Sequence, residues 1–136
     1  MKVQLSEIID AVDFTDDNTE YYLDRETGEI IMINDEIMDR SECEELSEQL
    51  DEHGFYQLPS QFDIDDYRTM ERFISTLTGR EADRLSRAIA GRGAFRRFKD
   101  EVIELGLSDQ WYKFQDDAHR SIAIRWCEEN DLEWEE

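Results

Sequence analysis

Apolar side chains recur at every third or fourth position through most of the second half of the chain, which is the pattern of amphipathic helices. This spacing predicts helices over about 63–78, 80–90, 94–105 and 108–130, with the third ended by Gly106. Glycine suits that position because the residue after a helix often adopts a positive φ. The apolar faces of three of these helices are formed by Tyr67, Met70, Phe73, Ile74 and Leu77, by Phe95, Phe98, Val102 and Leu105, and by Trp111, Phe114, Ala118, Ile122 and Trp126.

The first half of the chain predicts short strands and one polar helix. Tyr21–Asp24 and Glu29–Ile33 have the composition of strands. The four residues between them, Arg25–Gly28, are predicted to form a hairpin loop with glycine at the position that needs a positive φ. Ser41–Glu44 has the spacing of a capping box, which predicts a helix that begins there and ends before Gly54.

These elements together predict an α+β fold, in which a small N-terminal β-hairpin with short helices precedes a mainly α-helical C-terminal half. A chain of 136 residues fits one domain, and it contains no internal repeat or low-complexity linker. We therefore expect a single domain. Its acidic α/β front part spans about 1–62, its helical part about 63–130, and a short acidic tail covers 131–136.

Charge is distributed unevenly along the chain. The net charge is −21, from 36 acidic and 15 basic residues. Residues 1–66 carry 21 acids and three bases, whereas residues 68–99 carry nine bases and three acids. An acidic front and tail therefore flank a basic middle. The net charge disfavours nucleic acid and anionic lipid as partners, so a nucleic-acid contact would have to use the 68–99 segment.

Targeting and redox features favour a cytoplasmic protein. No run of about 18 apolar residues indicates a membrane span. Residues 1–12 lack the pattern of a signal peptide. Cys43 and Cys127 lack CxxC spacing and are too few for a disulfide framework. We expect a cytoplasmic location and no membrane partner.

Motifs for catalysis, metals and cofactors are missing. The two histidines, His53 and His119, do not have a zinc-binding spacing, and no acidic segment has the glycine and glutamate positions of an EF-hand. No nucleophile motif is present, and neither cysteine has a histidine as a sequence neighbour. The sequence therefore predicts no catalytic residue, no metal site and no cofactor.

An arginine-bearing turn remains as the candidate for binding. Gly91-Arg92-Gly93 is predicted to form a turn at the N-terminus of a helix, where free N–H groups attract anions. Arg96 and Arg97 are predicted to reach the surface, with Asp100 and Glu101 as partners four residues on. Two interpretations stay open: the arginines neutralise the acidic front part, or they bind an anionic partner. The candidate residues are Arg80, Arg84, Arg87, Gly91, Arg92, Gly93, Arg96, Arg97 and Lys99.

The run Gly91–Asp100, with the letters GRGAFRRFKD, resembles an uncharacterised family of small acidic bacterial proteins. The resemblance extends over nearly the whole chain. It implies a bacterial cytosolic protein and assigns no activity, cofactor or partner. The other segments that carry the resemblance are Lys2–Asp10, Thr27–Gly28, Leu58–Pro59, Asp65–Glu71, Trp111–Phe114 and Ala123–Asn130.

Two functions from different classes fit the sequence. The first is a non-enzymatic interaction module that presents its acidic surface or its arginine surface to an unknown protein or anionic ligand. The second is an enzyme for a phosphorylated small molecule, in which Arg92, Arg96 and Arg97 hold the anion and Tyr67, His119 or a carboxylate moves the proton. A flat arginine surface favours the module, and a deep pocket favours the enzyme.

Overall fold

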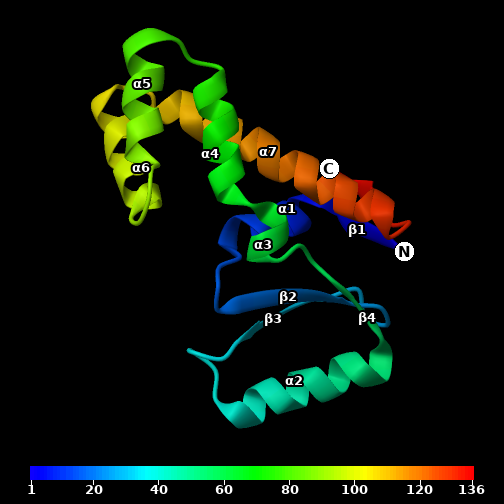
Figure 1. The fold of residues 1–136 in the computed structure, drawn as a ribbon. Helices are drawn as coiled ribbons and strands as arrows, with labels where there is room; N and C mark the ends of the chain where they lie inside the picture. Colours follow the sequence, from blue (N-terminus) through cyan, green and yellow to red (C-terminus); the bar gives the residue numbers. More distant parts are fainter. The chain divides into compact units, whose positions relative to one another are not determined.

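A computed structural model describes residues 1–136 and confirms the α+β fold (Figure 1). Short strands and helices fill the first half, and helices fill most of the second. The elements are β1 (Lys2–Gln4), α1 (Leu5–Phe14), β2 (Thr19–Asp24), β3 (Ile30–Asn34), α2 (Arg40–His53), β4 (Phe55–Gln57), α3 (Gln61–Ile64), α4 (Asp66–Ser75), α5 (Gly79–Ala88), α6 (Ala94–Glu104), α7 (Ser108–Glu129) and β5 (Glu133–Glu135).

The chain forms two compact units. Residues 1–64 and 119–136 make up the sheet unit, and residues 65–118 make up the helical unit. The end of α7 and the residues after it therefore group with the front of the chain rather than with the helices that precede them. The single-domain expectation stays a prediction.

The sheet unit is built around a three-stranded antiparallel sheet in the order β3-β2-β4. The hairpin was predicted correctly: Tyr22 pairs with Ile31, and Gly28 has a φ of 77° in the connecting turn. β4 pairs with the other edge of β2, so that Asp24 lies opposite Phe55. Successive side chains along a strand point to opposite faces of the sheet, so each strand contributes side chains to both faces.

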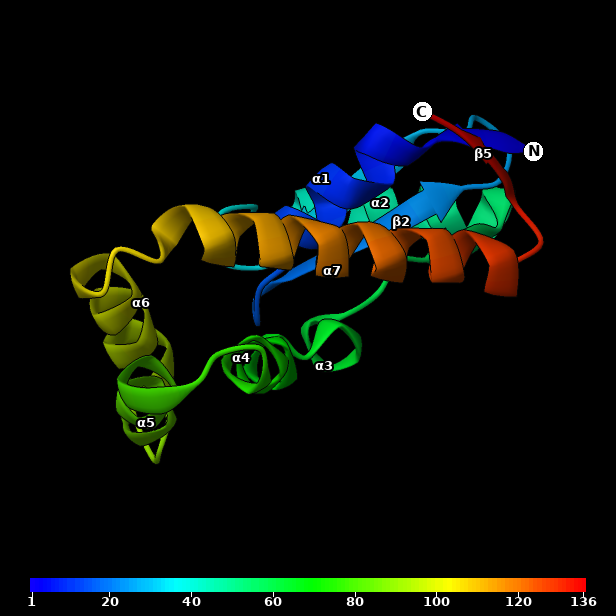
Figure 2. The same ribbon diagram turned by 90° about the horizontal axis from the view of Figure 1, so that it is seen from above.

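One face of the sheet packs on the main core of this unit, and α2 covers the other face (Figure 1). In the view from above, α1 and the C-terminal part of α7 lie side by side (Figure 2). Both helices contribute to that core, which is mostly aliphatic. Its buried residues are Val3, Leu5, Ile8, Ala11, Leu23, Leu58, Ala123, Trp126, Cys127 and Leu132.

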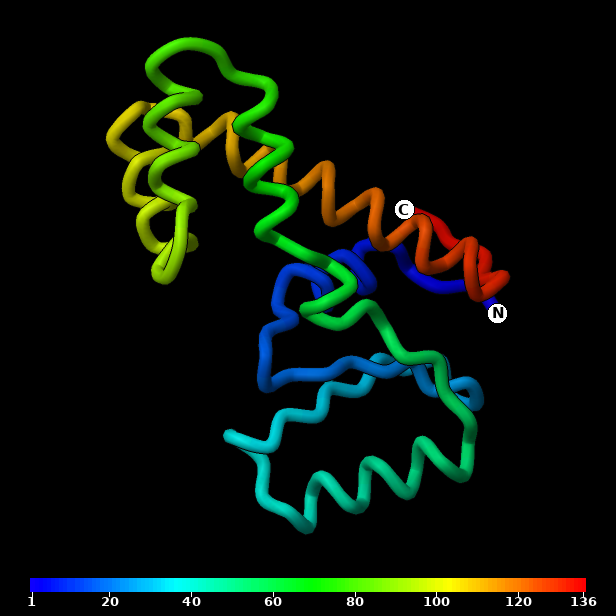
Figure 3. Tube along the Cα trace, viewed as in Figure 1, coloured from blue at the N-terminus to red at the C-terminus, as the bar shows by residue number.

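Within the acidic tail, residues 133–135 form the strand β5. β5 pairs in parallel with β1, with Val3 opposite Trp134, and the two chain ends therefore lie side by side (Figure 3). Lys2 forms an ion pair of 3.1 Å with Glu135. This strand was not predicted, because its pairing joins residues about 130 positions apart and no local pattern in an acidic segment marks such a partner.

Two helices begin differently from expectation. The side chain of Asp39, rather than Ser41, caps α2 by accepting the N–H of Glu42 at 2.8 Å. The helix predicted from about 63 begins at Asp66, where the side chain of Asp65 caps α4 from a left-handed backbone with a φ of 49°. Residues 61–64 form a separate turn of helix, in which Asp63 accepts the hydroxyl of Ser60 at 2.9 Å.

The helical unit has an aromatic core. Phe73 and Trp111 lie with ring centroids 5.3 Å apart, and Phe98 and Trp111 4.7 Å apart, both edge to face. Phe98 is 2% exposed, as predicted, but Phe95 is 54% exposed, so its placement in the core was wrong. Phe95 stands in the first turn of α6, at the edge of the buried face.

No helix of the chain has the length and apolarity needed to cross a membrane.

Candidate functional site

The predicted glycine turn joins α5 to α6. Gly91 and Gly93 both have a φ of 76°, a conformation that side chains with a Cβ adopt only with strain. Gly93 is also the N-cap of α6, and a Cβ at this position would lie 2.9 Å from Nη1 of Arg97. The backbone at position 93 therefore favours glycine, and a Cβ there would also displace the end of the Arg97 side chain.

Arg97 holds this turn together. Its Nε donates to the carbonyl oxygen of Ala88 at 2.8 Å, and Nη2 donates to that of Ala90 at 2.6 Å. Nη1 donates to the carbonyl of Arg92. These carbonyls lie at and beyond the C-terminal end of α5, where no helical N–H remains to satisfy them. The guanidinium of Arg97 thus has a structural task that the sequence did not reveal.

Arg84 joins α5 to α6. Its Nη2 lies 2.6 Å from a carboxylate oxygen of Glu101 and 3.9 Å from one of Glu104, with the side chains of Arg84 and Glu101 half-buried. The expected pair of Arg97 with Glu101 does not form, because Glu101 points to Arg84 and Arg97 points to the turn. The expected pair of Arg96 with Asp100 does not form either. Arg84 and Arg97 thus both have their partners inside the helical unit.

The other five basic candidates are exposed and form no ion pair or side-chain hydrogen bond. Arg80 and Arg87 stand on α5. Arg92 in the turn, with Arg96 and Lys99 on α6, forms what we call the basic surface. Nearby lies an open depression of about 410 Å³ that is lined by both basic and acidic side chains, and the acids would repel a bound anion. Its lining residues are Arg84, Arg87, Ala88, Arg97, Asp100 and Glu101.

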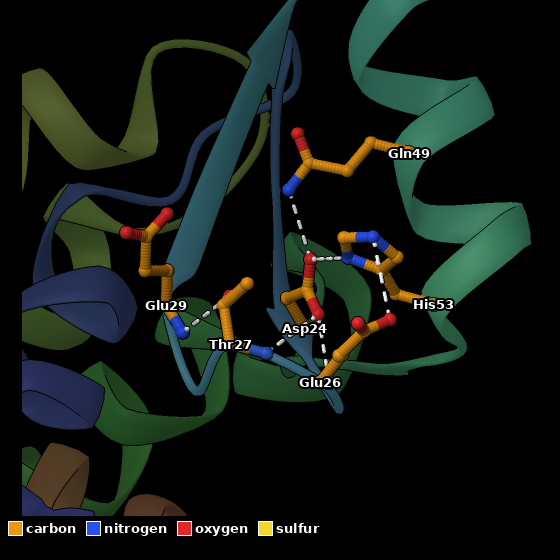
Figure 4. Close-up of polar contacts among 6 residues, drawn as sticks. All are labelled: Asp24, Glu26, Thr27, Glu29, Gln49 and His53. Carbon is orange, nitrogen blue, oxygen red and sulfur yellow. Dashed lines mark hydrogen bonds and ion pairs between the residues drawn. The ribbon is translucent and has the colours of Figure 1, made fainter.

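A second polar cluster, which was not predicted from the sequence, lies in the sheet unit. Asp24 ends β2 and is 0% exposed (Figure 4). One carboxylate oxygen accepts the backbone N–H groups of Glu26 and Thr27 at 2.8 and 3.1 Å. The other accepts Nε2 of Gln49 at 2.9 Å and Nδ1 of His53 at 2.8 Å. One buried carboxylate therefore ties the hairpin turn to the last turns of α2.

This geometry fixes the charges of the cluster. Burial alone would raise the pKa of Asp24, but the hydrogen bonds from Gln49, His53, Thr27 and Glu26 outweigh it and hold the pKa well below its usual range. The hydrogen bond to Asp24 raises the pKa of His53; burial opposes this shift, while the charges of Asp24, Glu26 and Glu52 add to it. A charged carboxylate and a readily protonated imidazole result. Nε2 of His53 also lies 3.4 Å from a Glu26 oxygen, so both ring nitrogens face acids.

The groups suggested for acid–base chemistry already have partners within their own units. The hydroxyl of Tyr67 donates to the carbonyl of Ile89 at 2.9 Å. Nδ1 of the buried His119 lies 2.6 Å from Asp13. No group of three or more histidine, cysteine or carboxylate side chains is arranged to hold a metal ion. The absence of a metal, cofactor or catalytic group stays a prediction.

A signal for the Asp24 cluster can be recognised afterwards. An aspartate that directly precedes a hairpin turn can accept N–H groups from that turn, as Asn and Asp do in Asx-turns. That signal predicts the contacts to Glu26 and Thr27. It does not predict Gln49 and His53, which come from a helix 25 and 29 residues away.

Comparison with known proteins gives a family and no activity. The model of an uncharacterised protein family, UPF0158, matches residues 1–135. A curated relative, UPF0158 protein PA5073 of Pseudomonas aeruginosa strain PAO1, is 27% identical over 135 residues, which cover 98% of this chain and 86% of the relative. No solved structure matches.

Proposed function

The chain belongs to the uncharacterised protein family UPF0158, and from this premise we propose that it is a non-enzymatic interaction module whose basic surface binds an anionic partner. The proposal assigns the binding role to the Gly91–Asp100 run. It places the protein in the bacterial cytoplasm, which is consistent with two unpaired cysteines and with a bacterial relative.

One observation carries this proposal. Arg92, Arg96 and Lys99 are exposed and without partners in a chain with 36 acidic residues. Acids are abundant enough to pair with every base, yet Arg92 projects into solvent from the turn that Arg97 holds, and Arg96 and Lys99 project from α6. Exposed cations that no acid of the chain neutralises attract an anionic partner electrostatically.

The alternative functions have weaker support. An enzyme for an anionic small molecule needs a pocket in which cations and an acid–base group converge, whereas the depression beside Arg97 alternates in charge. A nucleic-acid partner would approach a helical unit of net charge −1 while the sheet unit, at −20, repels phosphate.

A capture experiment tests the proposal. The purified protein is immobilised and exposed to bacterial lysate, with and without nuclease. We expect Arg92→Ala/Arg96→Ala/Lys99→Ala to lose a partner that the unmodified chain captures. The matched control Arg68→Ala/Arg72→Ala/Lys113→Ala removes the same charge from exposed positions of the same unit and should retain it. Equal capture by both triple variants would contradict the proposal, and release by nuclease would favour nucleic acid.

A further inference from the structure

We infer that the basic surface takes one kind of partner, an acidic amphipathic helix of another protein, which lies along the exposed face of α6. The inference rests on the proposed function and deepens it. It names a class of partner from two properties of α6 that the charge pattern alone does not contain: exposed apolar side chains, and their spacing along the helix.

The exposed face of α6 is partly apolar. Phe95 is 54% exposed and Ile103 is 57% exposed, although both are large hydrophobic residues. At about 100° per residue, Phe95, Lys99, Ile103 and Arg96 fall within one sector of about 100°. Two apolar side chains and two cations thus share one exposed face, which adjoins the side that buries Phe98 and Val102.

The spacing fits a helix better than a single small ligand. Phe95 and Ile103 are eight residues apart, which is about 12 Å along a helix axis. A partner helix with apolar residues on adjacent turns can contact both side chains. Acidic residues that flank its apolar stripe then come within reach of Arg96 and Lys99, and Arg92 extends the cationic side at the N-terminal end of α6. Helices recognised in this way bind through side chains spaced at i, i+3, i+4 and i+7.

A phosphate backbone fits this face less well. Asp100 and Glu104 are exposed on the same helix, so a continuous row of phosphates would meet acids within a turn of Lys99. Phe95 could stack on a base, but the aliphatic side chain of Ile103 offers no such stacking. A partner with only a few acids, placed beside apolar residues, avoids both conflicts.

The test uses defined probes and fluorescence anisotropy. The probes are a labelled helical peptide of about 16 residues with a stripe of leucines flanked on both sides by glutamates, a scrambled peptide of the same composition, poly-glutamate, and single-stranded DNA of about the same length. The variants are Phe95→Ala, Ile103→Ala and Arg96→Ala/Lys99→Ala. Tyr112→Ala is the matched control, because it truncates another exposed hydrophobic residue of the helical unit. Circular dichroism verifies that each variant is folded.

We expect the amphipathic peptide to bind more tightly than the scrambled peptide, poly-glutamate or DNA. Phe95→Ala and Ile103→Ala should each weaken its binding by about fivefold or more, the effect of a residue that carries interface energy, and Tyr112→Ala should not. Failure of the amphipathic peptide to bind at about 100 µM, equal binding of the scrambled peptide, or tighter binding of DNA would overturn the inference.

The variants also separate the two proposals. If Arg96→Ala/Lys99→Ala weakens anionic probes while Phe95→Ala and Ile103→Ala change nothing, the basic surface stands and the helical partner is wrong. If the charge variant changes no probe while DNA or peptide still binds, the proposed function fails as well.

Discussion

The two compact units differ more in charge than in size. The sheet unit carries 25 acids and five bases, a net charge of −20, whereas the helical unit carries 11 acids and ten bases, a net charge of −1. The division that the sequence suggested, an acidic front and a basic middle, therefore follows the units of the structure closely once residues 119–136 join the front. Almost all of the net negative charge therefore lies in the sheet unit.

The two units also stabilise their turns with opposite chemistry. In the sheet unit, the carboxylate of Asp24 collects four donors from a hairpin turn and from α2. In the helical unit, the guanidinium of Arg97 distributes its donors over three backbone carbonyls at the end of α5. A carboxylate has two acceptor oxygens and a guanidinium has five N–H donors, so each group can form several hydrogen bonds at once. The charged side chains that hold the two turns are thus hydrogen-bonded within their own units, whereas Arg92, Arg96 and Lys99 stay exposed.

The largest effect is expected in the aromatic core of the helical unit. Phe98→Ala removes a side chain that is 2% exposed and packs edge to face on Trp111, so it should lower the free energy of unfolding by about 3–5 kcal/mol. Phe95→Ala, on the exposed side of the same helix, should change it by about 0.5 kcal/mol or less. Urea denaturation followed by tryptophan fluorescence measures both. Similar losses for the two variants would show that α6 buries a wider face.

The glycine turn distinguishes backbone strain from a steric clash. Gly91→Ala and Gly93→Ala each add a Cβ to a residue with a φ of 76°, which should lower the free energy of unfolding by about 1–2 kcal/mol. A Cβ at position 91 meets no atom within 4 Å, whereas one at position 93 meets Arg97. Gly93→Ala should therefore lower the melting temperature more than Gly91→Ala. Equal shifts would mean that Arg97 gives way without loss of its carbonyl contacts.

In the sheet unit, the Asp24 cluster should make stability depend on pH. Because the folded state raises the pKa of His53, the protonated ring stabilises the fold below its unfolded pKa of about 6.5, and this contribution is lost as pH rises through the folded pKa. The lowered pKa of Asp24 contributes stability above about pH 3.9 that is lost on acidification through its folded pKa.

Melting temperatures measured from pH 5 to pH 8.5 test the histidine. We expect His53→Gln, which keeps an N–H donor but does not titrate in this range, to show a flatter decline above about pH 6.5 than the unmodified chain. Parallel curves would mean that His53 contributes no pH-dependent stability.

The smallest effect is expected from salt, and it should differ between the units. Raising ionic strength to about 0.15 M, where the Debye length is about 8 Å, screens the repulsion among the excess acids. We expect the amides of β2 to become better protected from hydrogen exchange while those of α6 change little, since only the sheet unit has a large net charge. A fall in melting temperature over this range would show that attraction between opposite charges dominates.

Some of this protein could be predicted from residues close together in the chain. The hairpin of residues 19–34, the helices of the second half and the positive φ at Gly91 and Gly93 all follow from local pattern. Periodicity and backbone preference act within one or two turns, so a short segment contains enough information to specify them.

Only the tertiary structure decided the rest. It paired β5 with β1, exposed Phe95 while burying Phe98, brought Gln49 and His53 to Asp24, and committed Arg97 to the turn. A local pattern states that a side chain is charged or that a face is apolar, but not which partner it meets. That choice depends on how segments far apart in sequence come together, because a buried carboxylate such as that of Asp24 requires whichever donors the folded chain brings within about 3 Å. The sequence by itself therefore determined the hairpin, most of the helices and the uneven charge of this protein, and the packing of those elements decided which charged side chains hold the fold and which remain exposed.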